Sequence, residues 1–276
     1  MWRARVDTPR AIGEVGIMFR ALHAALGRNR KWGRGRKWGR VPKWRMCLYA
    51  IVAIAAAAVA PFALNQAYRE VLRWDPEWRF VEEVLLRPAS GGTEPLVIRW
   101  ATSPRIALVK ATAEDEAFVR AFVATLDEVL EGSGLSPRLV EGGKSNFQVY
   151  FATRARFDRL AVNLGADPLT SGTGFYLIWP SERLDIVAAV AVVGADSSAA
   201  ERQAVIVHQL AHALGLRGDS AVFPDSAVFT QGDRGSTATA FSPIDRKLLR
   251  LLYTHLGSAN EWSELRAAYR RYWDAS

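Results

Sequence analysis

The chain has 276 residues and a formal net charge of +8, and half of its residues are hydrophobic, so it can bury a sizeable core. Its single cysteine excludes a fold held together by disulfides. The positive charge is not spread evenly, because residues 1–45 hold thirteen Lys and Arg against two acidic residues, whereas the other residues hold 23 basic and 26 acidic ones.

The basic tail, residues 1–45, contains a short repeat of cations, tryptophans and glycines between Lys31 and Arg45. Glycine and proline disfavour a stable helix there. We interpret the tail first as a cytoplasmic topology signal, and contact with anionic lipid is compatible with that interpretation. Nucleic-acid binding through phosphate contacts and stacking ranks third.

Residues 46–64 form a stretch of nineteen residues without a charge, long enough to cross a bilayer as a helix. We predict a single-pass transmembrane signal-anchor, with the N-terminus in the cytoplasm and residues 65–276 outside it. A cleaved signal peptide is the alternative. It is disfavoured because the basic region is very long and Pro61 follows the small-residue triplet 58–60, although the triplet 65–67 leaves a second option open.

Residues 65–95 are expected to be a helical stalk or connector, broken at Asp75-Pro76 and at residues 90–92, and the exported body is expected to span residues 96–276. Periodicity and turn signals predict strands and helices in a mixed order, which indicates the α+β class. The predicted strands are Leu96–Ala101, Arg105–Lys110, Phe147–Ala152, Phe175–Trp179 and Ile186–Val193; the predicted helices are Ala113–Glu131, Arg154–Leu160, one between Ser198 and Gly215, one opening at Ser242, and Glu261–Trp273.

The most informative stretch is His208-Gln209-Leu210-Ala211-His212, within a predicted helix that ends at Gly215. Histidines four residues apart project from one helix face and can hold one metal ion. In the zinc-peptidase motif H-E-x-x-H the glutamate is the general base, and here Gln209 stands at that position. The pattern therefore indicates a possible zinc site with its catalytic base replaced by a neutral amide. The alternative is a decayed site with two hydrogen-bonded histidines.

Residues 208–253 resemble the metzincin-like branch of zinc peptidases through His208-x-x-x-His212-x-x-Gly215 and a later turn and apolar helix. Residues 96–256 are more closely similar to an uncharacterised bacterial family of zincin-like exported domains. The shared motifs are Ala-Leu-Gly-Leu at 213–216, Asp-Ser at 219–220, and Asp245 followed by Leu-Leu-Arg-Leu-Leu-Tyr at 248–253. This resemblance implies a zincin-like fold with a small mixed sheet, a motif helix and C-terminal helices.

The chain departs from the metzincin pattern at three points. The base is Gln209, and the third ligand is expected at Gly218, which has no coordinating side chain. Asp219 takes the ligand role if the turn shifts by one residue, with Asp225 and His255 as fallbacks. The methionine of the family's later turn is also missing, and Phe223 is its nearest analogue.

We therefore expect a membrane-anchored, zincin-like domain that is catalytically impaired and binds a peptide or cell-envelope ligand. Two alternatives remain: an active zinc-dependent peptidase with a displaced base, and a non-enzymatic sensor or scaffold whose basic tail binds anionic lipid or nucleic acid. Strand Ile186–Val193 is either an edge to which a peptide adds or a buried core strand, and core burial is favoured. The expected location is the inner membrane, with the C-terminal domain in the periplasm.

Overall fold

A computed structural model describes residues 75–86, 95–141, 144–165, 173–232 and 234–275. The chain divides into two units, Met1–Leu64 and Asn65–Ser276, and all the described residues belong to the second. Among these residues no helix has the length and apolar character needed to cross a membrane. The predicted basic tail 1–45 and anchor 46–64 lie outside the described residues.

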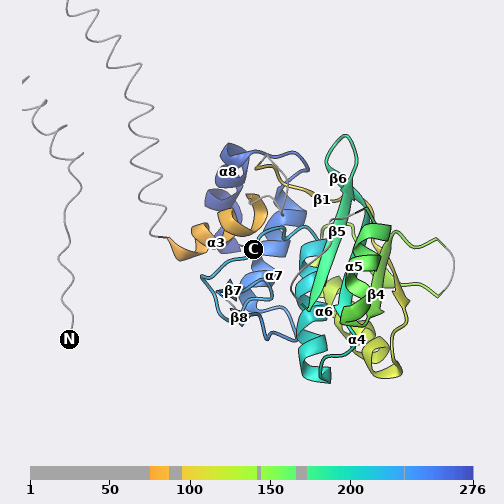
Figure 1. Ribbon diagram of the computed structural model, residues 1–276. Coiled ribbons are helices and arrows are strands. Elements are labelled where there is room, and N and C mark those ends of the chain that lie inside the picture. The colour runs from red at the N-terminus through yellow and green to blue at the C-terminus, as the bar shows by residue number, and fades with distance from the viewer. Residues whose placement is uncertain (1–74, 87–94, 142–143, 166–172, 233, 276) are drawn as a thin grey trace, which may run out of the picture. The chain divides into compact units, whose positions relative to one another are not determined.

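The body is built on a six-stranded mixed sheet (Figure 1). The strand order is β1-β6-β4-β2-β3, and β5 pairs antiparallel with β6, while the other pairings in this sheet are parallel. The strands are β1 (Arg99–Trp100), β2 (Arg105–Val109), β3 (Arg138–Leu139), β4 (Phe147–Ala152), β5 (Gly174–Pro180) and β6 (Asp185–Gly194). The predicted mixed sheet is confirmed, but its mainly parallel pairing and interleaved helices correct the α+β expectation to a mixed α/β fold.

Strand β6 lies inside this sheet, because β4 pairs with it along one side and β5 along the other. Its residues from Ala189 to Gly194 are all buried. The favoured core-burial interpretation of this strand therefore holds, and β6 is not an edge strand. Beyond β6 the sheet ends at β5, which pairs with β6 alone among the strands in the described part of the chain, and β3 forms the opposite edge.

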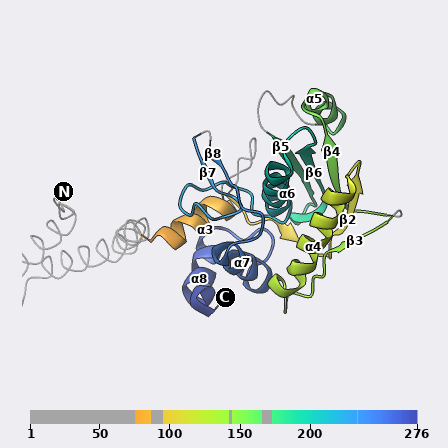
Figure 2. The same cartoon turned by 90° about the horizontal axis from the view of Figure 1, so that it is seen from below.

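Helices cover both faces of the sheet, and Figure 2 shows α5 (Arg154–Asn163) on the side opposite α4 (Ala113–Val129) and α6 (Ala199–Ala213). The alternation of side chains along the strands explains this division. Val190 and Val192 of β6 pack with Phe157 of α5, whereas Ala191 belongs to the larger core that includes α4 and α6. Helix α6 thus lies against β5 and β6, with its histidines near the outer strand of the sheet.

The N-termini of α4, α6 and α7 (Pro243–Arg250) each carry a capping box, in which a Ser or Thr and an acidic residue satisfy the free amides of the first turn. The cap of α6 at Ser198 and that of α7 at Ser242 confirm the sequence-based helix starts. Helix α7 continues as a π-helix, Leu251–His255, and α8 (Trp262–Tyr272) and a final 3₁₀ turn, Trp273–Ala275, follow. A separate hairpin is formed by β7 (Thr230–Gln231) and β8 (Arg234–Gly235).

Helix α3 (Pro76–Leu86) lies in the segment for which the sequence predicts a helical stalk or connector, but it packs into the folded body. Asp75 accepts hydrogen bonds from the amides of Glu77 and Trp78, at 3.0 and 3.2 Å, so Asp75-Pro76 starts this helix. Trp78 is 2% exposed, lies edge-on to Trp262 and Tyr269 of α8, and belongs to the main core. The folded body therefore includes α3 and begins about twenty residues before Leu96.

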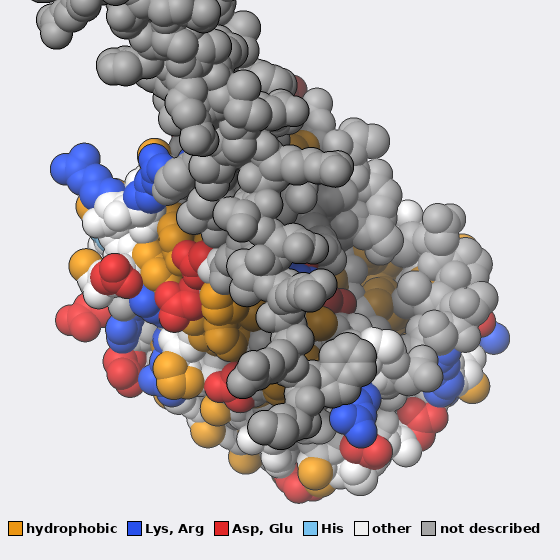
Figure 3. All heavy atoms as spheres, turned by 90° about the vertical axis from the view of Figure 1, so that its left-hand side faces the viewer, with side chains coloured by type: hydrophobic (Ala, Val, Ile, Leu, Met, Phe, Trp, Pro, Cys, Tyr) orange, Lys and Arg blue, Asp and Glu red, His pale blue; other side chains and the backbone are white. Residues whose placement is uncertain are grey.

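Charged side chains of both signs are interspersed with apolar ones on the visible part of the face in Figure 3. This distribution agrees with the near-neutral composition of the sequence after residue 45. It gives no indication of a basic nucleic-acid-binding surface on that part of the face.

Candidate metal centre

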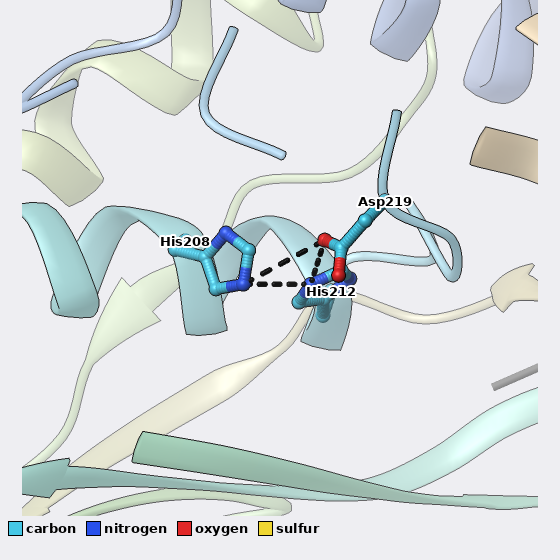
Figure 4. A group of neighbouring side chains, drawn as sticks. All are labelled: His208, His212 and Asp219. Carbon is cyan, nitrogen blue, oxygen red and sulfur yellow. Dashed lines mark hydrogen bonds and ion pairs between the residues drawn. The ribbon is translucent and has the colours of Figure 1, made fainter. Parts of the chain in front are cut away.

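His208 and His212 lie one turn apart on α6, with His212 in its last turn, and their rings face each other (Figure 4). The two Nε2 atoms are 3.1 Å apart, and the ring planes are close to perpendicular, at 86°. The side chains are 20% and 4% exposed, respectively. The helical spacing thus produces the paired arrangement that the sequence predicted.

Both rings are oriented by backbone carbonyl groups. Nδ1 of His208 lies 2.8 Å from the carbonyl oxygen of Ala227, and Nδ1 of His212 lies 2.5 Å from that of Leu216. Because a carbonyl oxygen only accepts, each Nδ1 must carry the proton and donate it. A neutral imidazole has one ring proton, so both Nε2 atoms then present lone pairs, as metal-binding histidines do.

The turn after α6 brings a carboxylate to these nitrogens. Gly215 has φ +98°, the amide of Leu216 donates to the carbonyl of Ala211, and that of Gly215 donates to the carbonyl of His212, which together form a Schellman turn. A Cβ atom on Gly215 would lie 2.6 Å from the carbonyl oxygen of Ile98, so only glycine fits there without strain. The turn directs the chain back along the helix face toward the histidines.

This turn places Asp219 beside the two histidines. Its Oδ1 atom lies 3.2 Å from Nε2 of His212 and 3.7 Å from Nε2 of His208. This oxygen is buried, and none of the described residues donates a hydrogen bond to it, although 43% of the side chain is exposed. The structure therefore brings together the three residues predicted as ligands, and the position after Gly218, which has no coordinating side chain, supplies the carboxylate.

The donor set fits zinc. A tetrahedral zinc ion bound at about 2.0–2.1 Å separates its ligand atoms by roughly 3.3 Å, close to the three separations found here. Burial lowers the pKa of His208 to about 4, so this ring is neutral at pH 7. Burial acts to raise the pKa of Asp219, but its interactions with His212, His208 and Thr230 together hold the pKa below its ordinary value, so the carboxylate is ionised. Two imidazoles and one carboxylate form a common zinc-binding set.

The end of α6 is held by two buried aromatic side chains that sequence reasoning did not identify as site residues. The indole Nε1 of Trp100 donates to the carbonyl of Ala213 at 2.8 Å, and the hydroxyl of Tyr253 donates to that of Leu214 at 2.7 Å. They satisfy carbonyls that a helix end leaves free, and they fix the start of the turn that carries Asp219. The position of Tyr253 in the Leu-Leu-Tyr motif was the available signal, but its partner lies 39 residues away.

Helix α3 holds the other side of the Asp219 loop. The amide of Gly218 donates to the carbonyl of Val84 at 2.9 Å, and the hydroxyl of Ser220 donates to the buried carboxylate of Glu83 at 2.7 Å. The residues on both sides of Asp219 are thus bonded to a helix that the sequence placed outside the folded body. No local sequence signal indicates this link.

Gln209 is 6% exposed, and its Oε1 atom has no hydrogen-bond partner within the part of the chain that the structure describes. Its Cγ atom lies 3.2 Å from the place where a Cβ of Gly174 would be, so its side chain packs against β5. Next along β5, Tyr176 stacks on the ring of His212, with the ring centroids 4.4 Å apart, and its hydroxyl donates to the carbonyl of Arg217. The side-chain amide of Gln209 therefore lies between α6 and the edge strand β5.

The fallback ligands do not join this cluster. His255 stacks on Tyr272 with centroids 3.8 Å apart, and Asp225 borders a surface hollow near Lys247. Among the described residues, the group able to hold a metal comprises His208, His212 and Asp219. Phe223, the analogue suggested for the missing methionine, packs edge-on against Phe80 of α3.

A family model described as a protein of unknown function (DUF2927) matches residues 78–258. No curated protein matches the chain. Two solved structures of myroilysin are similar to it at 13% sequence identity and a TM-score of 0.35; one match covers 59% of this chain and 100% of the myroilysin chain, and the other covers 63% and 92%. The family match runs from α3 past the π-helix and so includes all three residues of the cluster.

Proposed function

The chain belongs to the DUF2927 family of proteins of unknown function, and from that premise we propose that its body is a zincin-like domain that binds zinc but has lost efficient peptidase chemistry. His208, His212 and Asp219 would hold the ion. Zinc bound in this way acts as a Lewis acid and lowers the pKa of a bound water.

One observation carries the metal assignment: both Nδ1 atoms face carbonyl oxygens while both Nε2 atoms face each other and Asp219. If the two histidines were bonded to each other, one Nε2 would need the proton. The Nδ1 of that neutral ring would then turn a lone pair toward the oxygen of Ala227 or Leu216, which is repulsive. A cation between the three atoms removes this conflict while both buried rings stay neutral, which favours a metal site over a relic in which two neutral rings are bonded to each other.

The loss of catalysis follows from Gln209. At this position a carboxylate would take the proton from the water that attacks the peptide, and a neutral amide cannot do so. Removing a general base typically lowers the rate about 10²–10⁴-fold. The alternative of an active peptidase with a displaced base needs a second carboxylate, but within the described residues the one in the cluster is Asp219, which is already committed as a ligand.

For the ligand we propose an extended peptide or peptide-like cell-envelope component. The outer edge of β5 supports this proposal, because a peptide can add to a free strand edge through backbone hydrogen bonds. Tyr176, which lies on this strand and stacks on His212, would place such a peptide beside the metal. The position of the body outside the cytoplasm, anchored by residues 46–64, is part of the proposal and rests on the sequence alone.

Gln209→Glu tests the proposal. The zinc-loaded wild-type chain should show no metal-dependent cleavage of casein or of envelope peptides, and Gln209→Glu should gain it, because the variant restores the base beside an existing metal. His208→Ala in the Gln209→Glu background is the control and should abolish any gain. Metal-dependent turnover by the wild type, unchanged by Gln209→Glu, would instead establish the active peptidase with a displaced base.

A further inference from the structure

Asp245, in the first turn of α7, has a fully buried side chain with an unusually complete set of hydrogen bonds. Its Oδ1 atom accepts from the hydroxyl of Ser226 at 2.6 Å, and its Oδ2 atom accepts from the amide of Ala227 at 2.9 Å. The amide and hydroxyl of Ser242 donate to Oδ2 at 2.9 and 2.8 Å. Two donors thus belong to the helix cap, and two come from the loop that follows Asp219.

Helix capping alone does not account for this arrangement. Glu201 on α6 and Glu264 on α8 occupy the same capping-box position, and both carboxylates are exposed to solvent. Burying a carboxylate carries a free-energy cost, and burial accordingly raises the pKa of Asp245. The additional feature of Asp245 is its pair of bonds to Ser226 and Ala227.

The backbone N–H and C=O of Ala227, which lie on either side of its Cα atom, connect Asp245 to the candidate metal cluster. Its N–H donates to Asp245, and its C=O accepts the Nδ1 proton of His208 at 2.8 Å. The carboxylate therefore fixes the residue whose carbonyl determines the tautomer and orientation of the His208 ring. Holding a ligand histidine in this way typically strengthens metal binding.

We infer that Asp245 is a positioning residue for the metal site, which holds Ala227 so that the Nε2 lone pair of His208 points toward His212 and Asp219. This inference rests on the proposed zinc function for its consequence. The hydrogen bonds that run from Asp245 through Ala227 to His208, here called the relay, are present in the metal-free chain. The relay and the zinc function can therefore be tested separately.

The test uses the full chain as wild type, Asp245→Ala, Asp245→Asn and Glu264→Ala. Glu264→Ala is the matched control, since it removes the same capping-box position from a helix that does not contact the cluster. Nitrogen NMR of labelled histidines reports the His208 tautomer in the metal-free chain, and competition with a chromophoric chelator reports the zinc affinity.

The relay predicts the Nδ1–H tautomer in the metal-free wild type. Asp245→Ala should lose this preference and bind zinc about 10–100-fold more weakly. Asp245→Asn keeps an oxygen that can accept from Ala227, so it should stay close to wild type in both measurements, as should Glu264→Ala.

An Asp245→Ala chain that keeps both the tautomer and the zinc affinity would overturn the inference. So would an Nε2–H tautomer of His208 in the wild type, and this result does not depend on whether Asp245→Ala folds. A wild type that holds the Nδ1–H tautomer but binds no zinc would instead refute the proposed function and leave the relay standing.

Discussion

The surroundings of the His208 ring make the free energy of unfolding depend on pH. Burial lowers its pKa to about 4 in the metal-free folded chain, from 6.5 for an unperturbed ring. Between these values the unfolded chain takes up a proton that the folded chain does not. The contribution of His208 to the free energy of unfolding is therefore complete above about pH 6.5. It falls by up to about 3 kcal/mol as the pH drops toward 4.

Chemical denaturation of the metal-free chain between pH 7 and pH 4 measures this loss. His208→Gln, which does not titrate in this range, should show a shallower decline than the wild type. Equal declines in the two chains would mean that the ring is not held neutral, and would remove the argument for its free lone pair.

At the same scale, the sequence identified the three clustered side chains better than it identified their surroundings. The spacing of His208 and His212 follows from helix geometry alone, and the shift of the third ligand from Gly218 to Asp219 followed from the lack of a side chain at Gly218. By contrast, Asp245 and Tyr253 act through backbone carbonyls or amides far away in the sequence. Such contacts leave no local pattern, so sequence reasoning could not assign their roles.

Among the elements, α3 makes the unexpected contribution, because it braces the loop that carries Asp219. Ser220→Ala removes the hydroxyl that donates to the buried Glu83 carboxylate at 2.7 Å. Hydrogen bonds to buried charged groups are typically worth about 1.5–3 kcal/mol, and the free energy of unfolding should fall by this amount. Zinc binding should also weaken, since Asp219 is the adjacent residue.

Ser136→Ala is the matched control, because Ser136 donates to the carboxylate of Asp127 at 2.9 Å in an exposed pair. Its effect in the same denaturation experiment should be within about 0.5 kcal/mol. If the two substitutions had equal effects, α3 would not be holding the metal loop.

The helical character of residues 76–86 was expected, but their burial in the folded body was not. An Asp followed by Pro can form an N-cap with a first-turn proline, and periodicity within residues 76–86 does not show which element such a helix packs against. The capping boxes at Ser198 and Ser242 were predicted correctly, because each precedes a long apolar pattern. Local signals thus located helix starts well and domain boundaries poorly.

At the scale of the whole molecule, the family resemblance implied a mixed sheet with a motif helix, and the structure has both. The pairing could not be predicted, because which strands become neighbours depends on contacts between residues far apart in the chain. This is why β6 was considered as a possible edge, whereas β5 occupies that position. The basic tail and the anchor at residues 46–64 remain predictions from composition.

The central claim is that this fold holds a zinc ion at His208, His212 and Asp219. Its most direct test is elemental analysis of the full chain, purified without added metal or chelating tags, beside the double variant His208→Ala/His212→Ala. The account predicts close to one zinc per wild-type chain and none in the folded double variant. A folded wild-type chain without zinc, and unable to take it up from a buffered zinc solution, would contradict it.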